Sequence, residues 1–131
     1  PAQDDYLCEL VDRVDRQIIV SGIGEQPAIA HLDGFGVNSF TSGCVCIAPC
    51  LSMKMLQALK ANEIESAEAM RRVFAPLEDL RNDINPIRVL HEAVAAADIA
   101  NTGPILPLLH GVDGDNHNKI AKAAKELLLR N

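Results

Sequence analysis

The chain has 131 residues, a formal net charge of −6 and few aromatic residues (one Tyr, three Phe and no Trp). A negatively charged chain with few stacking side chains is a poor ligand for nucleic acids and anionic membranes, so we expect neither as a partner. No apolar run approaches the ~20 residues that a membrane-spanning helix needs. The hydrophobic fraction of 48% is instead typical of one globular domain with an aliphatic core.

The first 22 residues predict a helix and then a short strand. Residues 4–14 carry apolar side chains at helical spacing, namely Leu7, Leu10, Val11 and Val14. Asp4 and Asp5 stand at the expected start of this helix, where they would cap it and favour its dipole. Ile18–Val20 is an apolar, β-branched run without alternation, which predicts a strand covered on both faces.

A second strand is expected about 20 residues later. Between the two strands, Ala28–Leu32 predicts a short helix that ends at Gly34. Val37–Thr41 then predicts the second strand, inside a glycine-rich and almost uncharged stretch. Two strands separated by a helix indicate a βαβ unit, and therefore a parallel sheet of the α/β class.

The rest of the chain predicts helices. Ser52 is a suitable N-cap for a helix that reaches about Ala61, with Leu51 and Leu56 as a hydrophobic staple. Three further helices are expected over 64–82, from Asn85-Pro86 to about Ala97, and over 118–130, with an irregular segment over 101–112. Pro76 lies inside the first of these three, where we expect a kink or break.

The cysteines allow two interpretations. Cys44, Cys46 and Cys50 form a C-x-C-x3-C pattern, but no histidine lies close in the sequence and the usual paired halves of a zinc site are missing. We therefore expect no metal, and buried or half-buried reduced thiols in a cytoplasmic protein. A zinc-binding domain that uses these three cysteines is the alternative.

Two βα units do not make a stable sheet by themselves. Residues 1–62 contain both expected strands, and residues 63–131 are expected to be all helical. Two parallel strands would leave both sheet edges and much of each face uncovered. The sequence therefore predicts that further strands come from another segment or that the chain forms a homo-oligomer.

Several short motifs, taken in order, resemble the C-terminal half of the dihydrodipicolinate synthase / N-acetylneuraminate lyase family. They are Ile18–Gly22 (IIVSG), Gly34–Thr41 (GFGVNSFT), Glu68–Leu80 with its central Pro-Leu, Asn85-Pro86-Ile87, and Gly103–Leu108 (GPILPL). The resemblance implies the last two parallel strands of a (β/α)8 TIM barrel with their helices, followed by an all-helical region. It also implies Schiff-base chemistry on pyruvate or a related 2-oxo acid, without a cofactor.

The resemblance assigns substrate contacts to three residues. The backbone of Gly22 and the main-chain carbonyl of Asn38 are expected to shape the pocket. Glu25 matches a carboxylate that sialic-acid-type lyases direct at the polyol tail of their substrate; the alternative is a solvated acid at a helix start. Gly24 stands where those lyases carry an aspartate, which argues against a sialic acid substrate.

The family's Schiff-base lysine, proton-relaying tyrosine and Thr-Thr pair lie upstream of every residue in this chain. We therefore expect no catalytic residue here, and an inactive fragment of a lyase or synthase. The alternative function is a non-catalytic half-barrel or truncated isoform that acts as an oligomerising or interaction module.

Overall fold

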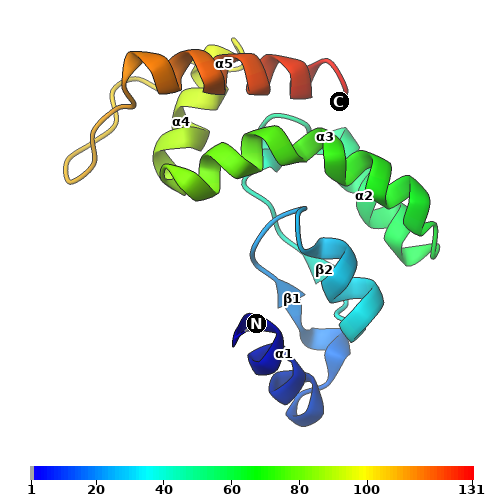
Figure 1. Cartoon of the computed structure of the whole chain (residues 1–131). Coiled ribbons are helices and arrows are strands. Elements are labelled where there is room, and N and C mark those ends of the chain that lie inside the picture. Colours follow the sequence, from blue (N-terminus) through cyan, green and yellow to red (C-terminus); the bar gives the residue numbers. More distant parts are fainter. Residues whose placement is uncertain (1) are drawn as a thin grey trace.

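A computed structural model describes residues 2–131, with side chains from Asp5 onward. The helices and strands are α1 (Ala2–Arg13), β1 (Val20–Ser21), β2 (Ser39–Phe40), α2 (Pro49–Lys60), α3 (Ile64–Asp83), α4 (Pro86–Ala96) and α5 (Gly114–Leu128). Three short helical segments lie between them: the 3-10 helices η1 (Arg16–Ile18) and η3 (Cys44–Cys46), and the π-helix η2 (Ala30–Gly34). Figure 1 shows that the chain is elongated, with α1 at one end and α4 and α5 at the other.

The two strands form a parallel sheet, as the βαβ pattern predicts. Val20 pairs with Ser39 and Ser21 with Phe40. Both strands are shorter than expected. In front of β1, the side chain of Asp15 accepts a hydrogen bond from the N–H of Gln17, and Ile18 therefore belongs to the helical turn η1.

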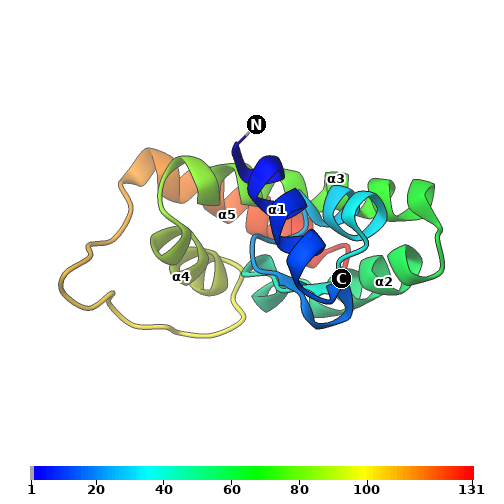
Figure 2. The same cartoon turned by 90° about the horizontal axis from the view of Figure 1, so that it is seen from below.

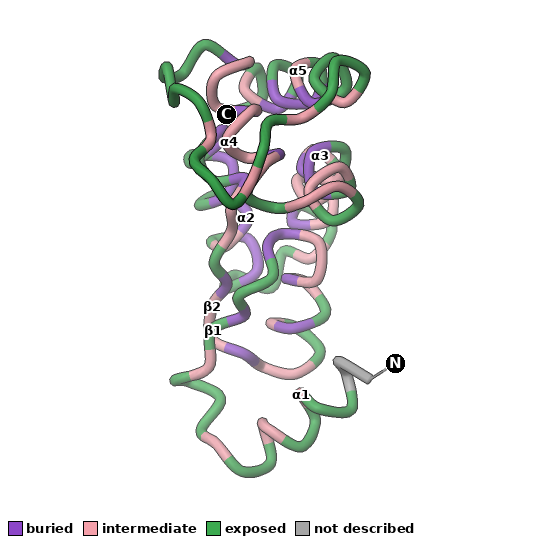
Figure 3. Tube along the Cα trace, turned by 90° about the vertical axis from the view of Figure 1, so that its left-hand side faces the viewer, coloured by how far each residue is buried: buried purple, intermediate pink, exposed green. Residues whose placement is uncertain are grey.

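The expectation that β1 is covered on both faces is wrong. Ser21 is buried, whereas Val20 is 50% exposed and Ile18, just before the strand, is 72% exposed. Figure 3 shows the segment from α1 to β1 as mostly exposed. An apolar strand with one exposed face is a typical surface for contact with another strand or another protein.

The expected N-terminal caps of the first two helices are wrong. α1 already begins at Ala2, so Asp4 and Asp5 lie within its first turns and do not precede it. α2 begins at Pro49, which takes the first helical position that proline favours, and Ser52 is therefore buried inside the helix. The oxygen Oδ1 of Asn131 accepts hydrogen bonds from the N–H groups of Cys50 (2.7 Å) and Leu51 (3.4 Å), so the cap of α2 comes from the end of the chain.

The later helices agree better with the sequence. α3 runs through Pro76 without a break; Pro76 and Arg72, four residues earlier, both lie on the exposed side, where solvent can replace the missing hydrogen bond. α4 begins as expected, with Asn85 accepting bonds from the next helical N–H groups. α5 begins at Gly114, earlier than expected, because Asp113 caps it through the N–H of Asn116 (2.9 Å).

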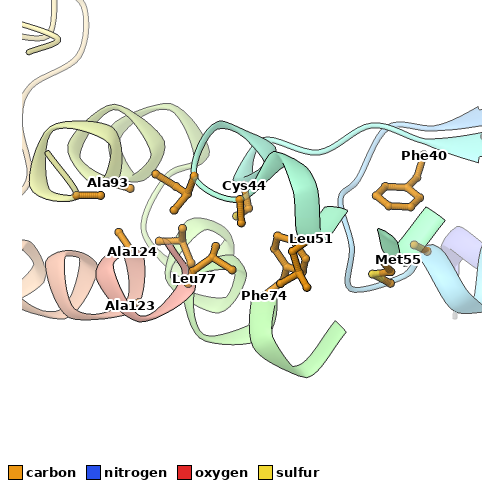
Figure 4. Packing of buried hydrophobic residues seen from close by; sticks show 14 of the residues in the cluster. Phe40, Cys44, Leu51, Met55, Phe74, Leu77, Ala93, Ala123 and Ala124 are labelled. Atoms are coloured by element: carbon orange, nitrogen blue, oxygen red, sulfur yellow. The ribbon is translucent and has the colours of Figure 1, made fainter. Parts of the chain in front are cut away.

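The core lies between the helices and not inside the sheet. Figure 4 shows Cys44, Leu51, Phe74 and Leu77 packed together, and all four belong to one buried cluster that extends into α4 and α5. α2 and α3 form a hairpin, and α5 lies across α3 and α4 (Figures 1 and 2). Phe40 connects β2 to this core.

Only one of the four thiols is fully buried. Cys44 is inside the core, whereas Cys8, Cys46 and Cys50 are exposed, so the expectation of buried or half-buried thiols is wrong for these three. No three His, Cys, Asp or Glu side chains cluster as metal ligands within residues that the structure describes. Over the same residues, no helix combines the length and the apolar character of a membrane span.

Candidate functional site

The carboxyl ends of the two parallel strands point to the same edge, where Gly22 follows β1 and Thr41 follows β2. Ligands of open α/β sheets bind outside this edge. Gly22 is exposed, and a Cβ atom added to it would meet nothing within 4 Å. Its backbone is therefore accessible to an approaching molecule, which fits a binding role but also an ordinary turn.

Glu25 lies in the loop after β1, and its carboxylate points into the protein. The residue is 0% exposed. Ser52 of α2 donates a hydrogen bond to Oε1 (2.7 Å), and Ser42 donates a short one to Oε2. The alternative of a solvated acid is therefore wrong, because both carboxylate oxygens are held by serine hydroxyls away from water.

A second buried acid, Glu78 of α3, holds the backbone of the same loop. Its Oε1 accepts from the N–H of Glu25 (3.1 Å) and its Oε2 from the N–H of Gln26 (2.7 Å). Arg81 pairs with Oε1 at 3.6 Å and donates to the carbonyl of Ile23 at 2.7 Å. One turn of α3 thus fixes three residues of the loop after β1, namely Ile23, Glu25 and Gln26.

The surroundings of Glu78 disfavour its negative charge. Burial is the largest cause and the nearby charge of Glu25 the second, and together they raise the pKa of Glu78 to about 7. The two N–H donors and Arg81 act in the opposite direction without cancelling this effect. Burial, with Glu78 close by, also raises the pKa of the Cys44 thiol, so this cysteine stays protonated.

The position of Glu78 explains why residue 24 is a glycine. Its φ is +111°, and an added Cβ atom would lie 2.0 Å from Oε1 of Glu78. The carboxylate of Glu78 therefore occupies the space that any side chain at position 24 would need.

Asn38 lies apart from Gly22 and Glu25. Its N–H donates to the carbonyl of Ile19 (3.2 Å), so it is level with the residue before β1 and not with the one after it. Its side-chain oxygen accepts from Nζ of Lys60 (3.4 Å). The structure thus brings Gly22 and Glu25 to the same loop and places Asn38 near the other end of the sheet.

An apolar groove of about 390 Å³ opens between α1 and β1. Its lining residues are Tyr6, Leu7, Leu10, Ile19, Val20, Ser21, Gly22, Ile23, His31 and Val37. Ser21 and His31 form a hydrogen bond of 2.8 Å between Oγ and Nδ1. Both are buried, and this polar pair ties β1 to η2 at the groove wall.

The sequence does not identify the three residues that hold Glu25, namely Ser42, Ser52 and Glu78, as parts of a site. Glu78 follows Phe74 by four positions, so it falls on the apolar face of its helix, and an acid at such a position is the one available signal. Ser52 has the same signal on α2, three residues before the buried Met55. Ser42 shows no pattern at all.

No family model and no curated protein sequence matches the chain. Solved structures do. A dihydrodipicolinate synthase from Oceanobacillus iheyensis matches with a TM-score of 0.72 and 23% identity, over 81% of this chain and 36% of that one. A dihydrodipicolinate synthase from Bacillus clausii matches with a TM-score of 0.71 and 24% identity, over 79% of this chain and 36% of that one. The resemblance is thus confirmed at the level of fold: the chain folds like part of a dihydrodipicolinate synthase, and spans 36% of the length of these two.

Proposed function

We propose that this chain is part of a lyase or synthase that forms a Schiff base with pyruvate or a related 2-oxo acid. The observation that carries the proposal is the fold, which matches part of two dihydrodipicolinate synthases over about four fifths of this chain (81% and 79%). The order of the short motifs, from IIVSG to GPILPL, supports the same family. Because a fold alone does not define an activity, the chemistry is proposed by analogy.

In this proposal, residues 1–62 supply the last two strands of a (β/α)8 barrel, and residues 63–131 form a helical region beside it. The reactive amine belongs to residues outside this chain. It adds to the ketone carbon, water leaves, and the resulting iminium withdraws electrons from the carbon atom next to it. No cofactor is required.

The lysines present here are poorly suited to that role. All of them are exposed: Lys54, Lys60, Lys119, Lys122 and Lys125. A Schiff-base lysine is activated by a desolvated pocket or a neighbouring cation, and an exposed side chain lacks the desolvated pocket. The fragment is therefore proposed to be inactive by itself.

We assign supporting roles to three residues. Gly22 offers an open backbone at the carboxyl end of β1. Glu25 borders the same edge and would reach a substrate hydroxyl by exchanging its bond to Ser42, which is only partly buried. The main-chain carbonyl of Asn38 is the third proposed contact, and its position near the amino end of β2 makes it the weakest of the three.

Trapping with borohydride tests the proposal. The chain is incubated with pyruvate, the imine is reduced, and the protein mass is measured. We expect no reduced pyruvyl adduct on this chain, and an adduct on a longer product of the same gene that includes upstream coding sequence. Samples without pyruvate control for other reductions, and an adduct on Lys54 or Lys60 would contradict the account.

A second candidate function is an oligomerising or interaction module without catalysis. The open groove between α1 and β1 favours it, because Tyr6 and Val20 of its lining are at least half exposed, as is Ile18 just before β1. An upstream coding sequence that lacks a lysine at strand-like spacing would favour this function over the lyase.

A further inference from the structure

A small depression of about 330 Å³ lies beside the amino ends of the two strands. Its lining residues are Gln17, Leu32, Gly36, Val37, Asn38, Leu59 and Lys60. Val37 and Leu59 are buried, so the base of the depression is apolar, whereas Gln17, Asn38 and Lys60 contribute polar side chains. A few polar groups around an apolar base are typical of sites that bind small molecules.

Two cations border this depression without a carboxylate partner. Nζ of Lys60 donates to Oδ1 of Asn38 (3.4 Å), and neither Lys60 nor Arg16 forms an ion pair within the part of the chain that the structure describes. Arg16 of η1 lies against Gly36, since its Cδ and Nη1 atoms are 3.5 and 3.7 Å from the point that a Cβ atom on residue 36 would occupy. The chain has a net charge of −6, so two unpaired cations at one depression are a local exception that attracts anions.

The amide side chains at the depression supply further hydrogen-bond donors. Because Oδ1 of Asn38 accepts from Lys60, its Nδ2 group remains able to donate to a ligand. The side-chain amide of Gln17 has no hydrogen-bond partner among the described residues. Two acids stand on adjoining segments, Asp15 before η1 and Asp33 of η2, but neither belongs to the lining. The depression therefore offers positive charge and donors without a competing carboxylate in its lining.

We propose that this depression binds a small oxyanion, namely the phosphate or carboxylate group of a metabolite, beside Lys60, Asn38 and Arg16. The two cations attract the anion, the amide of Asn38 orients it, and the apolar base contacts the carbon atoms that carry it. The site uses the side chain of Asn38 and lies away from Gly22 and Glu25, so it does not depend on the proposed lyase function.

Equilibrium dialysis of this chain tests the site directly. The chain is dialysed against radiolabelled inorganic phosphate and, separately, against radiolabelled acetate. The ionic strength is held constant with potassium chloride, because salt screens an exposed ionic contact. We expect saturable binding of one of the two anions that approaches one per chain, and the anion that binds more tightly identifies the chemical class. Uptake that does not saturate for either anion would overturn the proposal.

Three variants assign the binding to this place. Lys60→Gln should weaken binding by about fivefold, because one exposed ionic contact is lost. Asn38→Asp keeps an acceptor for Lys60 but places a negative charge beside the ligand, so it should abolish binding. Lys54→Gln is the matched control, because Lys54 is an exposed lysine of the same helix α2 that does not line the depression. Wild-type affinity in the first two variants, or an equal loss in the control, would contradict the assignment.

A second measurement covers the case in which a variant does not fold. Backbone amide chemical shifts of the wild type are followed by NMR during titration with the same anions, so that no substitution is needed. Saturable shifts that are concentrated at Gln17, Gly36 and Asn38 support the site. Shifts that are concentrated elsewhere in the chain overturn it.

Discussion

At the scale of single residues, Gly24 and Glu78 depend on each other. Glu78 is an acid on the apolar face of α3, and it is tolerated because two loop N–H groups and Arg81 satisfy its oxygens. Gly24 is required because the loop reaches Glu78 with a positive φ and no room for a Cβ atom. The two residues together determine how the loop after β1 meets the helices.

Gly24→Ala should therefore be strongly destabilising. The side chain would collide with Oε1 of Glu78 and would force a conformation that L residues rarely adopt. We expect a loss of about 2 kcal/mol or more in the free energy of unfolding, measured by urea denaturation. Gly22→Ala is the control, because its Cβ atom would meet nothing within 4 Å, and a loss below about 1 kcal/mol is expected there. Equal losses for the two variants would argue against the contact with Glu78.

At the scale of elements, helix starts depend on whether the cap is local. Asn85 and Asp113 cap α4 and α5 from adjacent positions. α2 has Ala48 at its N-cap and receives its acceptor from Asn131. Because α2 forms much of the core contact with α3, this bond connects the end of the chain to the centre of the molecule.

Asn131→Ala removes that distant cap and should lower the free energy of unfolding by about 1 kcal/mol. Asn131→Asp keeps the acceptor and adds a negative charge at the helix N-terminus, so it should match or exceed the wild type. Thermal denaturation of the three proteins at neutral pH measures both effects. If the alanine variant is as stable as the wild type, the bond to Cys50 contributes nothing.

At the scale of the whole molecule, the main feature is that one side of the sheet is exposed to solvent. The helical part encloses a continuous core, whereas the groove beside β1 leaves apolar side chains in water. In the proposed lyase, further barrel strands would cover this side. For this chain by itself, we expect a second copy to cover it.

Light scattering after size exclusion should therefore show dimers or larger species that depend on concentration. Val20→Lys places a charge on the open face of β1 and should shift the chain toward the monomer, because lysine on a strand edge opposes pairing. Leu129→Lys is the control, since Leu129 is an exposed apolar residue of the C-terminal region, far from β1 in the chain. A wild type that stays monomeric at high concentration would count against both the open sheet and the missing strands.

The sequence determined the local features. Helical spacing, Asn85-Pro86 and the βαβ order predicted the helices and the parallel pair, because their signals lie within a few residues of each other. The short motifs also pointed to the dihydrodipicolinate synthase family. The chain folds like part of two solved synthases of that name. Gly22 and Glu25 lie in the same loop after β1, and their role in substrate binding stays a prediction.

Only the tertiary structure decided the rest. It placed Glu78 under the loop, turned the carboxylate of Glu25 inward to Ser42 and Ser52, and moved the cap of α2 to Asn131. Each of these contacts joins residues at least 17 positions apart, where spacing in the sequence carries no information. Burial also determines the acidity of Glu78, because the pKa of this side chain depends on the groups that surround it in space and not on its neighbours in the chain.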